Sequence, residues 1–265
     1  MKWKHVWKRA LRSVVFVVGS VYGTGLALGI LFADRMIFLP RPASYTLNEP
    51  FFLLPMHDGN QVCVRHVRNP DARYTILYSH GNAEDIGELG EVLEAFKAHG
   101  YAVVAYDYSG YGMSTGAPSE QAAYANIMTV YDYLTEDEKL RPEQIVVFGR
   151  SVGGGPSVEL AATRPVGALV LESAFTSAFR VLTRIKMFPI DKFDNIRKIA
   201  SVSCPVLIIH GRRDEIIPFH HGKALYDRAA SPKMHFWVDS ARHNDVMWAA
   251  GRAYWKTLAE FIDSL

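Results

Sequence analysis

The sequence predicts an α/β fold built on a mainly parallel β-sheet with helices on both faces, and three observations support this prediction. Short apolar segments alternate with segments of helical periodicity along most of the chain. Most of the short segments are apolar at every position, which is typical of strands that are buried on both sides. The 265 residues, of which 49% are hydrophobic, are enough for one large core. One domain with an N-terminal appendage is therefore the simplest organisation.

The predicted elements follow one another from residue 61 onward. Strands are predicted over residues 61–67, 74–79, 101–106, 145–148, 168–171, 206–210 and 235–238. Helices are predicted over residues 86–99, 119–134, 156–163 and 221–229, with a final helix from Asn244. The alternating polarity of 61–67 indicates an edge strand. Residues 175–202 interrupt the alternation, and the apolar side chains between Phe179 and Ile190 predict a short lid over the carboxyl ends of the strands.

The N-terminus carries a basic segment and then a long uncharged one. Residues 1–12 hold five of the 29 basic residues and no acidic residue, which leaves 24 basic against 27 acidic residues in the rest. Residues 13–33 form an uncharged run of 21 residues, about the length that crosses a bilayer as a helix. A cleaved signal peptide is the alternative, but its apolar region is usually only about 7–15 residues long. We therefore expect a basic tail over 1–12, a transmembrane anchor over 13–33, and a linker and approach segment over 34–60.

The flanking charges predict how this anchor is oriented. Basic residues precede the span, whereas Asp34 offsets the positive charges that follow it, so the N-terminus is expected in the cytoplasm. The domain over residues 61–265 then faces the bacterial periplasm, or the lumen in a eukaryotic cell. The glycine pairs Gly19/Gly23 and Gly25/Gly29 have the spacing that lets two membrane helices approach closely. Because glycine is common in membrane helices, a monomer and a helix-mediated dimer both remain open. Nothing outside the basic tail indicates a nucleic-acid partner.

Cys63 and Cys204 are the only cysteines in the sequence. They are predicted to fall on strands about five positions apart in the sheet. At about 4.8 Å per strand, that separation exceeds the roughly 7 Å between Cα atoms that a disulfide tolerates. We expect two free thiols.

The segment Gly149-Arg150-Ser151-Val152-Gly153 supplies both a candidate nucleophile and a turn that exposes it. It lies between the predicted strand 145–148 and the predicted helix 156–163, which is the context of a nucleophile elbow. Its glycines lack the Cβ atoms that would collide with the neighbouring strand and helix. Taken alone, the pattern is equally compatible with an ordinary glycine-rich β-to-α loop.

A serine hydroxyl needs a base and an orienting carboxylate before it becomes a good nucleophile, and both follow in the chain. Asp214 comes just after the strand 206–210, and His243 follows the strand 235–238. The order serine, aspartate, histidine is that of the α/β-hydrolase arrangement. We expect Ser151 to attack a carbonyl group, His243 to accept its proton, and Asp214 to orient the imidazole.

The oxyanion of the tetrahedral intermediate needs hydrogen-bond donors. The backbone N–H groups of Val152 and of Asn82, in the loop after the strand 74–79, are expected to supply them. In the same loop His80 is expected to brace the chain, and Asp107 is expected to bond within its own loop. Glu172 also ends a strand and is an alternative acid for the triad.

No metal or cofactor is expected. His220 and His221 point to opposite sides of the backbone and lack metal-ligand spacing, so they are read as a solvated pair and not as a zinc site.

These motifs together resemble the α/β-hydrolase-domain serine hydrolases that include the animal palmitoyl-protein depalmitoylases and their membrane-anchored bacterial and fungal relatives. The resemblance covers residues 74–262 and rests on the segments 78–85, 106–112, 149–153 and 193–196, on His210-Gly211 with Asp214, and on Gly222 with His243-Asn244-Asp245. It implies an α/β-hydrolase fold with a short lid, hydrolysis of acyl esters or thioesters, and Ser151, Asp214 and His243 at the triad positions.

The sequence departs from this family at two points. The animal enzymes resemble one another in a cysteine-rich, lipidated N-terminus, whereas this chain has no cysteine before Cys63. Arg150 stands where the elbow of those relatives carries a glutamine. We therefore expect a membrane-anchored serine hydrolase that forms an acyl-enzyme, with acyl esters or thioesters of lipids or acylated proteins as its substrate class. A serine peptidase or amidase on the same triad, and a non-catalytic anchored scaffold, are the alternatives.

Overall fold

A computed structural model describes residues 2–183, 191–230 and 232–265, and its contacts divide the chain into two units, Met1–Ile37 and Phe38–Leu265. The first unit is the helix α1 (Lys2–Ile37), whose exposed side chains include Phe16 and Val21. Within the described ranges, no helix combines the length and the apolar character needed to cross a membrane. Residues 13–33 are thus helical, but the predicted membrane span is not confirmed.

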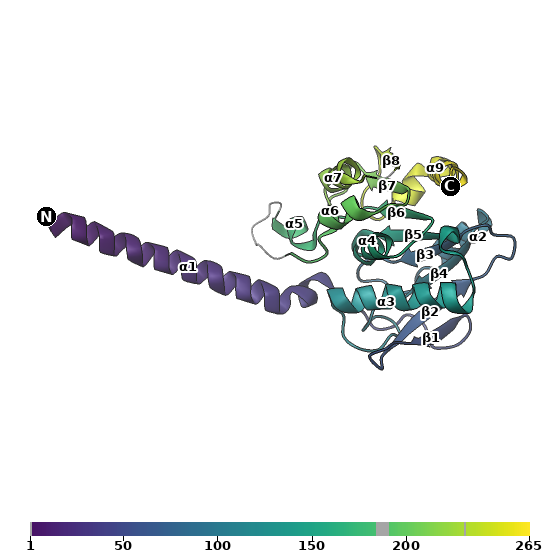
Figure 1. Cartoon of the computed structure of the whole chain (residues 1–265), viewed down its shortest axis with the longest axis horizontal. Helices are drawn as coiled ribbons and strands as arrows, with labels where there is room; N and C mark the ends of the chain where they lie inside the picture. The colour runs from purple at the N-terminus through teal and green to yellow at the C-terminus, as the bar shows by residue number, and fades with distance from the viewer. Residues whose placement is uncertain (1, 184–190, 231) are drawn as a thin grey trace. The chain divides into compact units, whose positions relative to one another are not determined.

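Among the described residues, the second unit contains an eight-stranded sheet with the order β1-β2-β4-β3-β5-β6-β7-β8, read from bottom to top in Figure 1. The strands are β1 (Phe51–Pro55), β2 (Gln61–Val67), β3 (Thr75–Ser79), β4 (Ala102–Tyr106), β5 (Ile145–Arg150), β6 (Ala168–Glu172), β7 (Val206–Gly211) and β8 (Lys233–Val238). Neighbours from β4 to β8 pair in parallel, whereas β2 pairs antiparallel with β1 and with β4. The predicted α/β class with a mainly parallel sheet is confirmed.

The prediction that residues 61–67 form an edge strand is wrong. β2 lies between β4 and β1, and β1 pairs with it from Phe51 opposite Arg65 to Pro55 opposite Gln61. β1 lies inside the 34–60 segment, where no strand was predicted because the apolar residues do not alternate with polar ones. Pro55 at its end suits the true edge, since proline cannot donate to a further strand.

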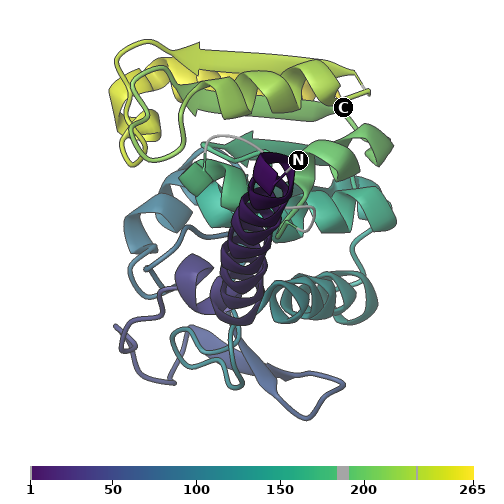
Figure 2. The ribbon, with the colours of Figure 1, turned by 90° about the vertical axis from the view of Figure 1, so that its left-hand side faces the viewer.

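Helices lie on both sides of the sheet (Figures 1 and 2). They are α2 (Gly90–Ala98), α3 (Glu120–Asp132), α4 (Gly154–Thr163), α5 (Ala178–Thr183), α6 (Asn195–Lys198), α7 (His220–Arg228), α8 (Val246–Ala250) and α9 (Arg252–Asp263). One buried cluster joins Phe96 of α2 and Tyr254 of α9 to Phe148 of β5. The preceding residue of β5, Val147, points to the opposite face, where α3, α4, α6 and α7 pack together. The final helix, predicted as one, is divided at Gly251, whose φ of +53° no α-helix accommodates.

The predicted lid over 175–202 contains α5 and α6. Residues 184–190, which make up much of its apolar segment, lie outside the described residues. Its two described ends are joined because Asn195 Nδ2 donates to the carbonyl of Phe175 at 3.0 Å. Phe179 of α5 is buried.

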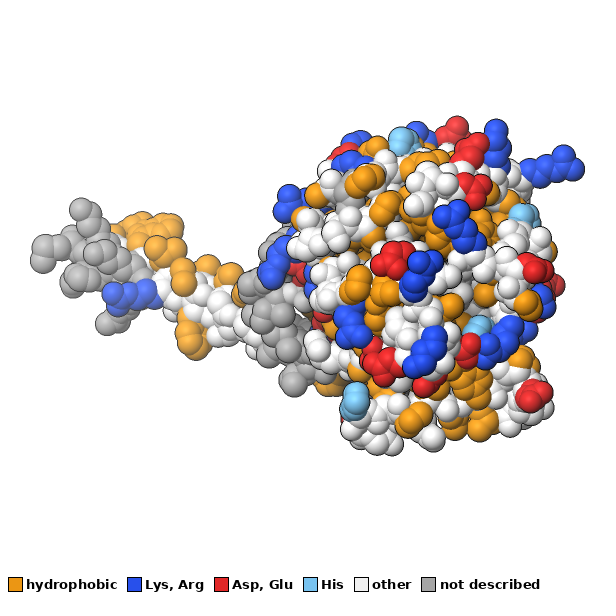
Figure 3. All heavy atoms as spheres, turned by 45° about the vertical axis from the view of Figure 1, so that its right-hand side comes forward, with side chains coloured by type: hydrophobic (Ala, Val, Ile, Leu, Met, Phe, Trp, Pro, Cys, Tyr) orange, Lys and Arg blue, Asp and Glu red, His pale blue; other side chains and the backbone are white. Residues whose placement is uncertain are grey.

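Both thiols lie in the interior of the protein, and charged side chains lie on its surface. Cys63 in β2 and Cys204, two residues before β7, are both buried and free. On the face of the molecule in Figure 3, basic and acidic side chains are interspersed over the second unit.

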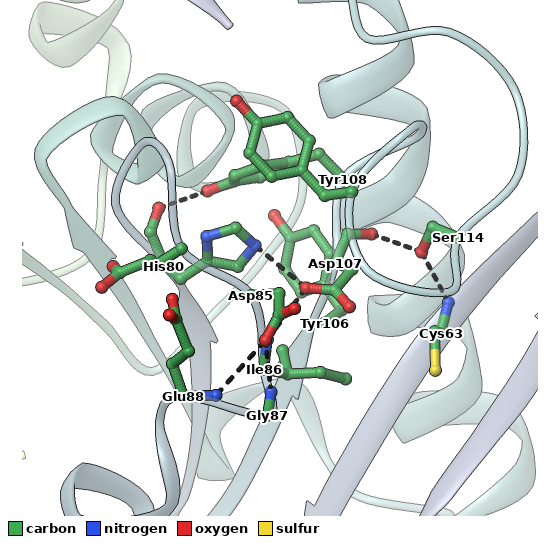
Figure 4. A network of polar contacts seen from close by, with 12 residues as sticks. Cys63, His80, Asp85, Ile86, Gly87, Glu88, Tyr106, Asp107, Tyr108 and Ser114 are labelled. Carbon is green, nitrogen blue, oxygen red and sulfur yellow. Dashed lines mark hydrogen bonds and ion pairs between the residues drawn. The ribbon is translucent and has the colours of Figure 1, made fainter. Parts of the chain in front are cut away.

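A buried polar network joins the loops that follow β3 and β4 (Figure 4). His80 Nε2 lies 3.3 Å from Asp107 Oδ1, and both side chains are fully buried. Asp107 also accepts hydrogen bonds from the backbone N–H of Ile86, at 2.9 Å, and from the hydroxyl of Tyr45. The carbonyl of His80 accepts from Tyr108 Oη at 2.6 Å. His80 thus braces its loop as expected, whereas the Asp107 side chain bonds to other segments and not to its own loop.

The ion pair decides the charge of His80. Burial lowers the pKa of His80, but the contact with Asp107 outweighs burial and raises that pKa above the ordinary value of 6.5. The buried carboxylate of Asp107 thus favours the charged form of the buried imidazole.

Replacing Asp107 by asparagine is expected to destabilise the protein by about 3–5 kcal/mol, because the change leaves a buried charge without its partner. Urea denaturation measures this difference as a shift in the midpoint. The matched control is Asp227→Asn, since Asp227 forms an exposed pair with Lys223 and is expected to contribute less than about 1 kcal/mol.

The same variant tests the sign of the pH dependence. A raised pKa in the folded state means that the pair contributes fully below pH 6.5 and that its contribution is lost as the pH rises through the folded-state pKa. The difference in unfolding free energy between wild type and Asp107→Asn should thus shrink on the alkaline side. A difference that grows with pH contradicts the raised pKa of His80.

Candidate active site

The loops after β5, β7 and β8 bring Ser151, Asp214 and His243 together. His243 Nε2 lies 3.0 Å from Ser151 Oγ, and His243 Nδ1 lies 2.8 Å from Asp214 Oδ2. All three residues are buried, with exposed fractions of 5–7%. They meet because neighbouring parallel strands end at the same edge of the sheet, so their following loops share one region. The structure therefore gathers the three residues that the sequence singled out.

Ser151 occupies a tight turn between β5 and α4. Its φ is +53°, a left-handed conformation that costs a non-glycine residue about 1–3 kcal/mol and is found at functional sites. A Cβ at Gly149 would lie 2.6 Å from the carbonyl oxygen of Gly153, and a Cβ at Gly153 would overlap the carbonyl oxygen of Ser79 at the end of β3. Both glycines are required by contact with backbone, which favours the elbow over an ordinary flexible loop.

Asp214 is surrounded by hydrogen-bond donors. Its Oδ1 accepts from the backbone N–H groups of Ile216 at 3.0 Å and Ile217 at 2.7 Å. Its Oδ2 faces His243 Nδ1 and also His210 Nε2, which is 3.3 Å away. Burial raises the pKa of Asp214, but the hydrogen bonds from His210 and His243 outweigh it and hold that pKa well below the ordinary 3.8. Asp214 is therefore ionised at neutral pH.

His210 was not identified as part of the site from the sequence. It lies on β7 and is fully buried. The signal available in the sequence was a histidine at the end of an otherwise apolar strand. Its Nε2 donates to the carbonyl of Ile217 at 2.8 Å, so the proton of the neutral ring is on Nε2.

Glu172, the alternative acid, has other partners. Tyr254 Oη donates to Glu172 Oε2 at 2.6 Å, and Arg150 Nε lies 3.8 Å from Glu172 Oε1. Burial raises the pKa of Glu172. Since Asp214 occupies Nδ1 of His243, the geometry selects Asp214 over Glu172.

The side chain of Asn82 is held in place by three donors. Its Oδ1 accepts from Tyr111 Oη at 2.6 Å and from the backbone N–H groups of Ala83 at 2.9 Å and Leu39 at 3.0 Å. Val152, the other residue expected at the oxyanion hole, lies directly after Ser151 in the buried turn. Both residues thus lie in rigid segments that border the nucleophile, because Gly153 packs against the start of the Asn82 loop.

The histidine pair at 220–221 is not the solvated pair that the sequence indicated. His220 is exposed, but His221 is buried, and its Nδ1 lies 2.9 Å from Thr176 Oγ1 at the base of the lid. The pKa of His221 is lowered to about 4, chiefly by burial. In the part of the chain that the structure describes, no group of three or more His, Cys, Asp or Glu residues could hold a metal ion.

Arg150 is a second site residue whose contacts the sequence did not reveal. It interacts with Glu84 and Asn244, besides Glu172, and these partners are up to 94 positions away in the chain. No local pattern predicts such contacts.

Known proteins are similar to this chain in sequence and in fold. The family model for serine aminopeptidase, S33, matches residues 70–194. Alpha/beta hydrolase domain-containing protein 17B of Xenopus tropicalis is 42% identical over 199 residues, which are 74% of this chain and 69% of that protein. The human 17B protein is 41% identical over the same length and shares.

A solved structure shows the same fold at low sequence identity. The esterase Pf2001 of Pyrococcus furiosus superposes with a TM-score of 0.71 and 18% identity, over 86% of this chain and 98% of the esterase. The sheet order, the parallel strands and the position of the elbow between β5 and α4 thus belong to an α/β-hydrolase fold. With relatives above 40% identity over two thirds of their length, this chain belongs to the alpha/beta hydrolase domain-containing protein 17 family and is a serine hydrolase.

Proposed function

We propose that this serine hydrolase cleaves acyl esters or thioesters through a covalent acyl-enzyme. The observation that carries the proposal is the hydrogen-bonded series from Ser151 Oγ through His243 to Asp214. A nucleophile within reach of a base, and a base held by a buried carboxylate, is the arrangement that acyl transfer requires.

The chemistry has two halves. Ser151 Oγ attacks the carbonyl carbon while His243 Nε2 takes the hydroxyl proton, and the protonated histidine then gives that proton to the departing alcohol or thiol. A water molecule attacks the acyl-enzyme in the second half, and His243 again removes a proton and returns it to Ser151. Ionised Asp214 stabilises the imidazolium in both halves and holds Nδ1 protonated.

The negative charge on the carbonyl oxygen needs donors fixed in advance. We assign this role to the backbone N–H groups of Val152 and Asn82. Val152 N–H lies in the 3-10 turn that leads into α4, where the helix dipole also favours negative charge. Each such donor typically contributes about 3 kcal/mol to the transition state.

The lid and the family resemblance bear on which acyl group the enzyme accepts. The resemblance to depalmitoylating enzymes and the apolar segment of the lid favour a medium or long acyl chain, on a lipid or on an acylated protein. Phe175, Phe179 and Phe193 are buried at the described ends of the lid, and the rings of Phe175 and Phe193 pack edge to face. These side chains make the base of the lid apolar, which suits an acyl chain better than a polar substrate.

An amidase is the second candidate, because the family model that matches residues 70–194 is described as serine aminopeptidase. The same triad hydrolyses both bond types, so the geometry alone does not separate them. A non-catalytic scaffold is disfavoured, since a strained Ser151 with intact partners serves no purpose in mere binding.

We also propose that α1 holds the enzyme at a membrane, with the N-terminus in the cytoplasm and the catalytic unit in the periplasm or a lumen. The support comes from the sequence: 21 uncharged residues follow five basic ones. The side chains of Val14, Phe16, Val18 and Val21 are exposed along this helix.

Substitution of the triad is expected to separate activity from stability. Ser151→Ala should reduce ester hydrolysis to background with an unchanged melting temperature. Asp214→Asn should lower kcat about 10⁴-fold, because the amide favours the wrong imidazole tautomer. Steady-state kinetics and thermal melts measure both effects, with Asp227→Asn as the control for the same chemical change. A near-normal kcat in Asp214→Asn contradicts the assignment of the acid.

Substrate profiling is expected to favour p-nitrophenyl esters of medium or long acyl chains over acetate, since the apolar lid contributes binding free energy with chain length, about 0.8 kcal/mol per buried methylene. The kcat/KM series from C2 to C16 measures this preference. A strict preference for acetate rules out the acyl-chain proposal, and comparable rates on aminoacyl p-nitroanilides support the amidase.

Membrane attachment is expected to depend on the uncharged stretch of α1. Wild type should remain in the membrane fraction after carbonate extraction, and Val17→Asp/Val18→Asp should shift the protein to the supernatant, because a charge at the centre of a span costs about 2.5–3.5 kcal/mol. Val17→Leu/Val18→Leu is the matched control. Release of wild type by carbonate contradicts the proposal.

A further inference from the structure

Arg150 lies at the second position of the elbow, between Gly149 and the nucleophile, and ends β5. Its side chain is only 16% exposed. A guanidinium so well covered needs partners around it, because burial disfavours its charge. Its neighbours raise the pKa of Arg150 above its ordinary value despite burial, so the side chain stays charged.

The first partner connects Arg150 to the oxyanion loop. Arg150 Nη1 lies 2.6 Å from Glu84 Oε1. The same oxygen accepts from the backbone N–H of Gly81 at 2.5 Å. Gly81 directly precedes Asn82, so the carboxylate of Glu84 holds the loop in a closed turn and Arg150 holds the carboxylate.

The second partner connects Arg150 to the loop of the catalytic base. Arg150 Nη2 donates to Asn244 Oδ1 at 2.8 Å. Asn244 follows His243, whose Nε2 must remain in reach of Ser151 Oγ. One guanidinium thus bonds to both loops that face the nucleophile, through two different nitrogen atoms.

The third partner balances the charge. Glu172 Oε1 lies 3.8 Å from Arg150 Nε, and its other oxygen is already taken by Tyr254. Two carboxylates therefore flank one cation in a largely buried place. A guanidinium spreads five N–H donors over three nitrogen atoms in a rigid planar fork, whereas an ammonium group has three donors on one nitrogen and a carboxamide has two.

We propose that Arg150 is a positioning residue that sets the separation between the Asn82 loop and the His243 loop on either side of Ser151. This inference rests on the proposed roles of Ser151, His243 and Asn82. Arg150 does not touch the reacting atoms. It fixes the oxyanion donor and the base in their working positions, so its loss affects the rate of acylation and not the affinity for substrate.

Arg150→Gln and Arg150→Lys test this role, together with Glu84→Gln. We expect each to lower kcat about 10- to 100-fold, the effect of misplacing a catalytic group by about 1 Å, and to change KM by less than about threefold. The rate of labelling by a fluorophosphonate should fall in parallel, because it depends on the same geometry. Arg150→Gln is the more informative variant, since it removes the positive charge as well as the planar fork, whereas Arg150→Lys keeps the charge.

The matched control is Arg68→Gln. Arg68 makes a bidentate pair with Glu138, at 2.6 Å for each contact, and is well exposed. Its loss should leave kcat and KM unchanged, while thermal melts compare the stability of both variants. A double variant Arg150→Gln/Glu84→Gln should have the kcat of the worse single variant, because the two side chains act as one unit.

Equal kcat in Arg150→Gln and Arg68→Gln overturns the proposal. A raised KM with normal kcat also overturns it and makes Arg150 a substrate-binding residue. If the Arg150 variants do not fold, Asn244→Ala supplies the second test, since it removes only the contact to the base loop, and an unchanged kcat there contradicts the role. Failure of the proposed function is distinct, because the wild-type protein itself would then hydrolyse none of the acyl esters.

Discussion

The close backbone approach at the elbow is the constraint on which the site depends. Gly153 lies so near the carbonyl oxygens of Ser79 and His80 that a Cβ would overlap them, and Gly149 lies equally close to Gly153. Three segments are therefore in contact through backbone alone: the end of β3, the end of β5 and the start of α4. This contact forces Ser151 into its left-handed conformation and keeps the nucleophile beside the loop that begins at His80. The nucleophile and the oxyanion loop consequently behave as one rigid block.

The close backbone packing at the elbow buries polar groups away from water. These groups pair with residues that are distant in the sequence. His80 and Asp107 fasten the loop after β3 to the loop after β4. Tyr111 and the backbone of Leu39 fasten Asn82 from a third side. The ion pair between Arg150 and Glu84 holds the same loop from the side of the elbow. Burying ionic groups lowers the stability of a protein unless their contacts compensate. Their concentration around the Asn82 loop indicates that the position of this loop is maintained at the expense of stability.

The sequence was sufficient for the sheet class and for the three triad residues, and insufficient for what surrounds them. Strand and helix periodicity is local, and the carboxyl ends of parallel strands meet by topology, so Ser151, Asp214 and His243 could be grouped without coordinates. β1 could not be found, because five apolar residues that are mostly half-buried have no alternation to detect. The contacts of Arg150 and of Asp107 link residues between 21 and 94 positions apart. Such pairings depend on side-chain directions that one sequence does not contain.

Two carboxylates lie at the carboxyl edge of the sheet: Glu172 at the end of β6 and Asp214 in the loop after β7. Their hydrogen-bond partners give them different roles. Asp214 receives two backbone N–H groups and faces two imidazoles, so its charge is stabilised and directed at His243. Nε2 of His210 donates to the carbonyl of Ile217, which holds the ring with that nitrogen 3.3 Å from the same oxygen that His243 uses. Glu172 receives a tyrosine hydroxyl and a guanidinium instead, and burial works against its charge. One carboxylate thus orients the base while the other balances the arginine, and neither can take over the other's role without repacking both loops.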